Sequence, residues 1–381
     1  MKQHNVSTIA ILIVAALSLI SFVPMLSDDF DADSDIVVTD GFDREFTFTD
    51  TPSKIVTIGA GFTSTAIDLG LLDQIIVADK YSKSNTDEMF DGLREKIDAG
   101  DIRANGSAYS SGLSDIKADI LTMTEALSLA DGTNVTDVAI FISGSSTQVE
   151  TLYADLTSNL EYKYKYVLCW TSADSYDTII DMAKTMSLVM KGYVDDKVKN
   201  MELLVDYIDE VLSDDDGLVR REAFYVNYSG GELKVGNIGS LANSMIHAAG
   251  GISVTEDPSK ASTYGANITF LLEQYGADVV LFVDNTLATN ETYMGALRTA
   301  IGSQDVKLVH LDPLWNNFCI RSMDGVWAMA CAMYADQYPD IFTGDVPDLT
   351  TEDEDNFALY ITIGVVCTVA ILILAFVYLR K

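Results

Sequence analysis

The chain has 381 residues, of which 48% are hydrophobic, and its formal net charge is -33. That hydrophobic fraction is enough to build a core, so the acidity does not indicate disorder, and the length allows an export segment, one or two globular lobes and an anchor. So negative a chain would repel nucleic acid and anionic lipid surfaces, which excludes nucleic-acid binding as a function.

The N-terminus has the order of a secretory signal. Lys2 precedes an apolar run from Ile9 to Val23, and the acidic segment SDDFDADSD follows. A basic start followed by an apolar stretch is typical of export signals. We predict that residues 1–27 form a signal peptide or an uncleaved signal anchor, because no small-x-small cleavage site stands out after Pro24.

Residues 35–173 are predicted to form an N-terminal α/β lobe. Short, nearly continuous apolar runs are typical of strands in a parallel sheet that is covered on both faces. Four runs have this character: Lys54–Gly59, Gln74–Asp79, Val138–Gly144 and Tyr166–Trp170.

Residues 174–213 are predicted to form the connecting helices. Apolar residues recur there at intervals of three or four, which is the spacing of one helical face. Gly192 interrupts the pattern and should divide two helices. The second, from Val194 to Leu212, would extend about 28 Å, long enough to bridge two lobes. A coiled coil would give a similar stripe, but the strands on both sides favour a connection.

Residues 218–343 are predicted to form a C-terminal α/β lobe. Its apolar runs are Ala223–Tyr228, Val279–Asp284 and Leu308–Asp312. The fold class is therefore α/β, with two Rossmann-like lobes and mainly parallel sheets joined by a long connecting helix. The runs leave open whether there are two separate sheets or one split sheet.

The C-terminus is predicted to anchor the chain. Residues 344–357 form an acidic stalk, which has too little apolar surface to fold. Residues 358–379 are uncharged, and a transmembrane helix needs ~20 such residues. Arg380 and Lys381 follow, and their charges should stay in the cytoplasm. We therefore expect a cell-membrane protein whose body lies outside the cell.

The sequence has no motif typical of a catalytic triad, a dinucleotide-binding site or a histidine-rich metal site. There is no Gly-x-Ser-x-Gly motif. The turn GAGFTS imitates a dinucleotide fingerprint, but Ser64 stands where the third glycine belongs. Of three histidines, His4 lies in the signal, which leaves only His247 and His310 for the body. We predict that the chain is not an enzyme and has neither a cofactor nor a metal site of its own.

The segment Thr51–Ser82 resembles the first strand–helix–strand unit of the periplasmic binding proteins that serve ABC importers of ferric siderophores, haem and vitamin B12. In that family a proline and a basic residue precede the first strand, as Pro52 and Lys54 do here, and an LG-x-x-D-x-I-V-G/A pattern leads into the second. Three later segments are similar to the family's long helical connection, its second-lobe helix and its last strand with a ligand-facing loop: 176–212, 236–257 and 306–315.

This resemblance implies an extracellular substrate-binding component of an ABC importer. It would capture an iron- or cobalt-containing chelate (a siderophore, haem or a corrinoid) between the lobes and deliver it to an ABC permease in the same membrane. A monomer is expected, and export, the C-terminal anchor and Asn-x-Ser/Thr sites suit an archaeal surface. The alternative is an anchored surface or adhesion module on the same fold, without a role in transport.

Capture of a flat or polyhydroxylated chelate needs aromatic faces and hydrogen-bonding groups that meet at a cleft. Arg321 could pair with an anionic chelate. The loops that follow the predicted strands offer the other candidate ligand contacts: Thr63, Ser64, Tyr81, Ser145, Trp170, Tyr228 and Trp315. The resemblance further implies that a glutamate on each lobe docks on the permease, and Glu125 and Glu273 are the nearest candidates.

Overall fold

The computed structural model describes residues 35–108, 112–131, 138–158, 163–171, 175–213, 218–276 and 278–350. Residues 35–347 form one compact unit. The predicted signal (1–27), the predicted transmembrane helix (358–379) and the second half of the predicted stalk lie outside the described residues. Within the described part of the chain, no helix is long and apolar enough to cross a membrane.

The N-terminal lobe is built on a four-stranded sheet with the order β4-β3-β5-β6, in which every pair is parallel. All four predicted strands are confirmed, as β3 (Ile55–Ile58), β4 (Ile75–Ala78), β5 (Ala139–Gly144) and β6 (Tyr166–Thr171). Every residue of β3, β4 and β5 is buried, as expected of a sheet with both faces covered.

Helices cover the two faces of this sheet. The helices are α2 (Ala60–Asp68), α3 (Lys80–Ser84), α4 (Asp91–Ala99), α5 (Leu113–Asp131) and α6 (Ser146–Ser158). α5 and α6 pack on one face, where Ile116 and Leu152 join its core. α2 covers the other face, where the Phe62 ring meets the rings of Phe141 and Trp170. The sequence reading did not predict the antiparallel pair of β1 (Ile36–Thr39) and β2 (Glu45–Phe48).

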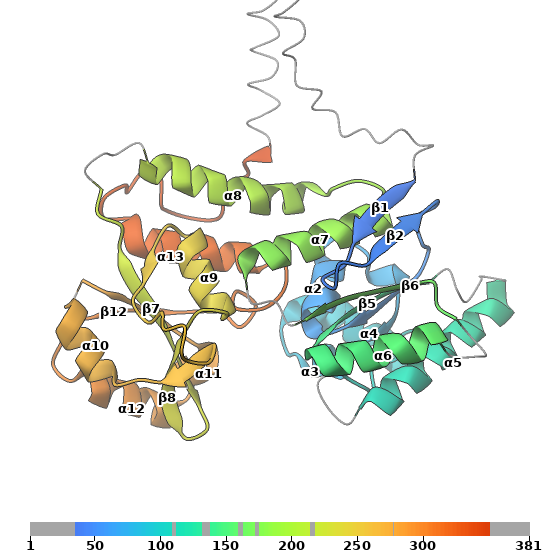
Figure 1. Cartoon of the computed structure of the whole chain (residues 1–381), viewed down its shortest axis with the longest axis horizontal. Helices are drawn as coiled ribbons and strands as arrows, with labels where there is room; N and C mark the ends of the chain where they lie inside the picture. The colour runs from blue at the N-terminus through green and yellow to red at the C-terminus, as the bar shows by residue number, and fades with distance from the viewer. Residues whose placement is uncertain are drawn as a thin grey trace, which may run out of the picture. The chain divides into compact units, whose positions relative to one another are not determined.

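Two helices connect the lobes, α7 (Tyr176–Lys191) and α8 (Asp196–Ser213). Gly192 ends α7 with a φ of 78°, so the predicted break is confirmed. The helices then fold back on each other, and α7 contacts β1 and α2 of one lobe and α9 (Leu241–Ala248) of the other (Figure 1). The predicted pair of connecting helices is thus confirmed, and both helices reach both lobes, because Lys197 of α8 donates to the Asp68 carbonyl oxygen of α2 at 2.6 Å and Asn200 of α8 contacts Met323 of the C-terminal lobe.

A second, separate sheet forms the C-terminal lobe, with the order β10-β8-β7-β11-β12 and with β9 beside β7. The strands are β7 (Glu222–Ser229), β8 (Glu232–Gly236), β9 (Ile252–Ser253), β10 (Thr263–Gly265), β11 (Val280–Val283) and β12 (Lys307–His310). β11 is parallel to both β7 and β12, whereas β8 is antiparallel to β7 and to β10. The mainly parallel arrangement is therefore confirmed for the first sheet, and the second sheet is mixed.

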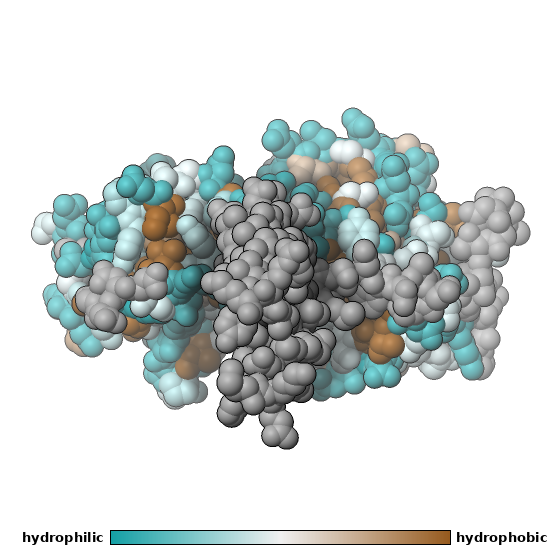
Figure 2. Space-filling view, turned by 90° about the horizontal axis from the view of Figure 1, so that it is seen from above, coloured by the Kyte–Doolittle hydropathy of each residue, from teal (hydrophilic) through white to brown (hydrophobic). Residues whose placement is uncertain are grey.

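The helices of the C-terminal lobe lie on both faces of its sheet: α9 (Leu241–Ala248), α10 (Ile268–Tyr275), α11 (Asn285–Ala288), α12 (Glu291–Ile301) and α13 (Ser322–Tyr334). α10 and α12 pack on the face that holds Phe224 and Val226, whereas α9 contacts β7 and α13 contacts β11. The described surface in Figure 2 is largely hydrophilic, with hydrophobic residues in scattered places. The boundaries 35–173 and 218–343 stay predictions, because the contacts join both lobes into one unit.

Candidate functional site

The loop Leu311–Arg321, which follows β12, contacts the N-terminal lobe at the start of α2. A Cβ atom built on Gly61 would overlap the carbonyl oxygen of Phe318 and lie 2.8 Å from its carbonyl carbon. Gly59, the N-cap of α2, has a φ of 110°, a conformation that favours glycine. Gly61 thus allows the start of α2, at the carboxyl end of β3, to approach the loop after β12. Ligands of α/β sheets bind at such carboxyl ends, so we take this junction as the candidate site.

An ion pair joins the lobes beside this junction. The Arg321 Nε donates a hydrogen bond to Asp68 Oδ1 at 3.1 Å, and Arg321 Nη1 lies 3.7 Å from Asp324 Oδ2. Burial raises the pKa of the Asp68 carboxyl, and the attraction of Arg321 and Lys197 does not offset it. Burial also raises the pKa of Asp324. Arg321, which the sequence reading offered to an anionic chelate, is therefore engaged with two carboxylates of the protein itself.

A hydrogen-bonded cluster lies at the carboxyl ends of the second sheet. The Tyr225 hydroxyl donates to Asp284 Oδ2 at 2.9 Å, and Asn316 Nδ2 donates to the Tyr225 oxygen at 3.1 Å. Burial, followed by the charge of Asp284, raises the pKa of Tyr225, so its hydroxyl keeps its proton. Asp284 and Asn316 are partly exposed. We call these three residues the Tyr225 cluster.

The sequence reading missed Tyr225 and Asp284. Asp284 comes directly after a buried strand, which was a usable signal, and its Oδ1 accepts a hydrogen bond from the Thr286 amide. Tyr225 lies inside an apolar run, so only the pairing of β7 with β11 reveals that it meets a carboxylate.

Two predicted contacts of the N-terminal lobe are exposed. Tyr81 is 46% exposed in the first turn of α3, which follows β4. Asp79 caps this helix, with Oδ1 accepting from the Tyr81 amide at 2.8 Å, and burial raises the pKa of its carboxyl. Ser145 is exposed after β5, with its hydroxyl 2.8 Å from Gln148 Oε1. Both side chains are accessible to a ligand at the carboxyl ends of their strands.

Three other predicted contacts are buried. The Thr63 hydroxyl oxygen lies 2.9 Å from that of Thr57, and both residues are fully buried. Ser64 is also fully buried, with its hydroxyl 3.4 Å from Met89 Sδ. Trp170 is 3% exposed and belongs to the aromatic group with Phe62 and Phe141. In this structure Thr63 and Trp170 are core residues of the N-terminal lobe, whereas Ser64, which also hydrogen-bonds the Cys319 thiol, is buried where α2 meets the loop Leu311–Arg321.

Trp315 and Tyr228 have different surroundings. Trp315 is partly exposed next to Asn316, so it lies beside the Tyr225 cluster. Tyr228 stacks on Tyr293, with ring centroids 4.0 Å apart. Because side chains alternate along a strand, Tyr228 and Tyr225 lie on opposite faces of the sheet. The structure does not bring Tyr228 together with Trp315 and the cluster.

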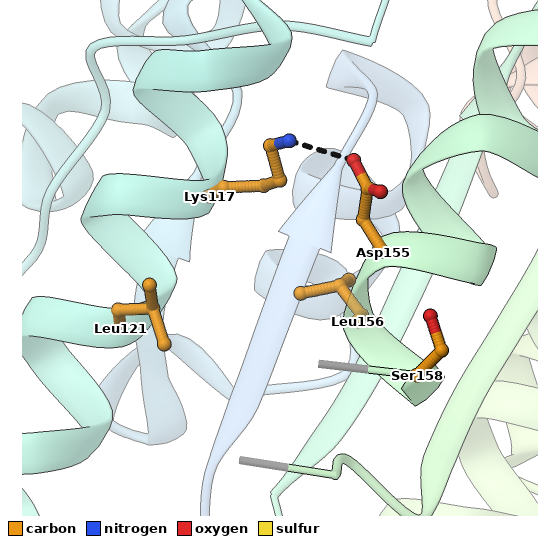
Figure 3. Close-up of a pocket in the computed structure, with 5 residues that line it drawn as sticks. All are labelled: Lys117, Leu121, Asp155, Leu156 and Ser158. Atoms are coloured by element: carbon orange, nitrogen blue, oxygen red, sulfur yellow. Dashed lines mark hydrogen bonds and ion pairs between the residues drawn. The ribbon is translucent and has the colours of Figure 1, made fainter. Parts of the chain in front are cut away.

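Two pockets stand out away from the junction. One, of about 500 Å³, is lined by Tyr228 together with residues of the β7–β8 hairpin and the segment 265–267. The other, of about 350 Å³, lies between α5 and α6, where Lys117 Nζ is 2.6 Å from Asp155 Oδ2 (Figure 3). Neither contains a residue of the loop Leu311–Arg321.

The proposed docking glutamates lie on helices near these pockets. Glu125 is exposed on α5 and Glu273 is exposed on α10. Exposure is what docking needs, but the permease role of both residues stays a prediction. Among the described residues, no group of three or more His, Cys, Asp or Glu side chains could hold a metal ion.

Comparison with known proteins finds solved structures of the same fold. No protein-family model and no curated protein sequence matches the chain. A periplasmic binding protein from Veillonella parvula matches with a TM-score of 0.52 and 14% identity over 83% of this chain and 95% of that one. A periplasmic heme binding protein from Pseudomonas aeruginosa matches with a TM-score of 0.51 and 12% identity, over 74% and 93% of the two chains.

A periplasmic vitamin B12 binding protein from Vibrio cholerae also matches, with a TM-score of 0.50 and 15% identity, over 75% of this chain and 98% of that one. At these identities the likeness concerns the fold. These neighbours are described as binding proteins.

Proposed function

We propose that the unit Asp35–Pro347 is the substrate-binding component of an ABC importer. The observation that carries this proposal is the architecture. Two sheets are joined by the pair α7–α8, and the loops at the carboxyl ends of the strands of both sheets meet at Leu311–Arg321. Periplasmic binding proteins for heme and vitamin B12 have the same fold. A ligand held between the lobes would draw on both sets of loops.

The ligand in this proposal is an iron- or cobalt-containing chelate. Heme and vitamin B12 each hold their metal in a macrocycle, and both are bound by neighbours in fold. Tyr81 and Trp315 supply partly exposed aromatic faces, while Ser145 and the Tyr225 cluster supply hydrogen-bonding groups. This combination of ring surface and a few polar groups suits a large, partly apolar chelate.

The placement in the cell is part of the same proposal and rests on the sequence. The signal 1–27 would export the chain, the helix 358–379 would anchor it, and the body would lie outside an archaeal cell as a monomer. Glu125 and Glu273, both exposed, would dock on the permease.

Intrinsic fluorescence offers a direct test. The chain has three tryptophans. Trp315 is partly exposed at the candidate site, whereas Trp170 and Trp327 are buried. We expect ferric siderophores, haem or cobalamin to quench the emission saturably at micromolar or lower concentration, after correction against free tryptophan amide. Trp315→Phe should remove most of the quenching and Trp327→Phe should retain it. Failure of every ligand to bind would contradict transport and favour the surface-module alternative.

A further inference from the structure

We infer that the Tyr225 cluster is a ligand-contact site that selects neutral or cationic chelates rich in hydroxyl, amide or ammonium donors and disfavours anionic ones. This inference rests on the proposed function, since it names the class of chelate that would fill the site between the lobes.

The hydrogen bonds of the cluster leave acceptor positions unoccupied on Asp284 and Asn316. The Tyr225 hydroxyl donates its proton to Asp284, and the Asn316 amide donates one proton to the Tyr225 oxygen. Because the pKa of Tyr225 is raised, its hydroxyl keeps its proton and remains the donor to Asp284. A carboxylate has about four lone-pair positions, of which Tyr225 and the Thr286 amide occupy two in Asp284. The remaining Asp284 positions and the Asn316 carbonyl oxygen call for donors from the ligand.

The loop Leu311–Arg321, which supplies Asn316, has one basic residue, and that residue is already paired. Arg321, at the end of the same loop, is engaged with Asp68 and Asp324. In the other lobe Lys80 is the first residue of α3, and its Nζ lies 5.1 Å from the centroid of the Tyr81 ring. Because Asp284 is only partly exposed, an anionic group placed against it would be repelled with little screening.

Asp284→Asn removes the charge with little change in shape. Asn caps helices as well as Asp does, so the bond from the Thr286 amide can persist. The matched control is Asp305→Asn, which makes the same charge change at an exposed position before β12 in the same lobe. Melting temperatures of both variants should stay close to that of the parent, which separates binding from folding.

The probes are a cationic ferric trihydroxamate, neutral cyanocobalamin, anionic haem and an anionic ferric tris-catecholate. We expect the cationic or the neutral probe to bind the parent protein most tightly. Asp284→Asn should weaken that binding at least about tenfold, because a hydrogen bond to a charged group is lost. Asp305→Asn should change it less than about twofold.

The outcomes separate this inference from the proposed function. Tightest binding of an anionic probe, with affinity unchanged or improved by Asp284→Asn and lowered by Lys80→Gln, would overturn the inference and leave the substrate-binding role in place. Tightest binding of a cationic or neutral probe that Asp284→Asn leaves unchanged would also overturn it. Binding of none of the four probes would contradict the substrate-binding role itself.

Discussion

Arg321 of the C-terminal lobe donates a hydrogen bond to Asp68 of the N-terminal lobe at 3.1 Å, although 253 positions separate them in the chain. The Asp68 side chain is 5% exposed and that of Arg321 is 46% exposed. A largely buried carboxylate thus depends on a half-exposed cation from the opposite lobe.

Loss of this cation should destabilise the unit. Arg321→Met leaves the Asp68 charge buried beside Asp324, so we expect the free energy of unfolding to fall by about 1–3 kcal/mol, less than for a fully buried pair because Arg321 is half exposed. Urea denaturation measures this. Arg298→Met, which breaks an exposed pair with Glu291, should cost less than about 1 kcal/mol. Equal losses in the two variants would contradict the importance of the interlobe pair.

The same carboxyls predict a pH dependence. Burial raises the pKa of Asp68 and of Asp324 above the value of about 3.9 that aspartate has in the unfolded state. The native state therefore binds more protons than the unfolded state at a pH between these values. Their contribution to the free energy of unfolding therefore falls as the pH rises from about 4 through the raised pKa values. Asp68→Asn removes one of these titrations. Urea titrations across this range should show the variant gaining stability relative to the parent as the pH rises, and a constant difference would refute the assignment.

The close approach at Gly61 is testable by adding one methyl group. Gly61→Ala places a Cβ atom on the Phe318 carbonyl group, so we expect a loss of about 1–3 kcal/mol in the free energy of unfolding. Gly295→Ala is the control, because it lies in α12 with open space around its Cβ position. It should be neutral or stabilise the protein by up to about 1 kcal/mol. A well-tolerated Gly61→Ala would mean that the lobes are less tightly apposed in solution.

Tyr81 is the exposed aromatic residue whose role in binding is simplest to test. Tyr81→Ala should weaken ligand binding by about tenfold through loss of a ring face, with little effect on the melting temperature. Tyr193→Ala, at a 50% exposed tyrosine after α7, should leave affinity unchanged. Isothermal titration with the tightest of the probes named above measures both variants, and equal effects would remove Tyr81 from the site.

Much of the fold could be read from the sequence because burial on both faces leaves a local signature. The runs that became β3, β4, β5 and β6 are apolar almost without interruption. Gly192 was readable for a different reason, since a glycine that breaks a helical stripe is typical of a left-handed cap. β8 and β10 were missed because they are short and only partly buried, so their apolar pattern is weak.

The candidate site was less predictable, because it depends on which way side chains point once elements pack. Thr63 and Ser64 follow a strand as expected, but α2 buries both, Thr63 against Thr57 of the sheet and Ser64 against Met89 and Cys319. Tyr228 was grouped with Trp315, although strand alternation puts Tyr228 on the opposite face from Tyr225, next to which Trp315 lies. Arg321 was offered to a ligand because its partner Asp68 lies too far away in sequence to be recognised.

The folded-back pair α7–α8 has a consequence for how the protein is made. The amide of Tyr176, at the start of α7, donates to the Ser244 hydroxyl of α9 at 2.9 Å, and that partner is 68 residues downstream. During synthesis from the N-terminus, the first sheet is complete before this partner has left the ribosome. We therefore expect a cotranslational intermediate in which the N-terminal sheet is formed before the Tyr176 amide can hydrogen-bond to Ser244 of α9.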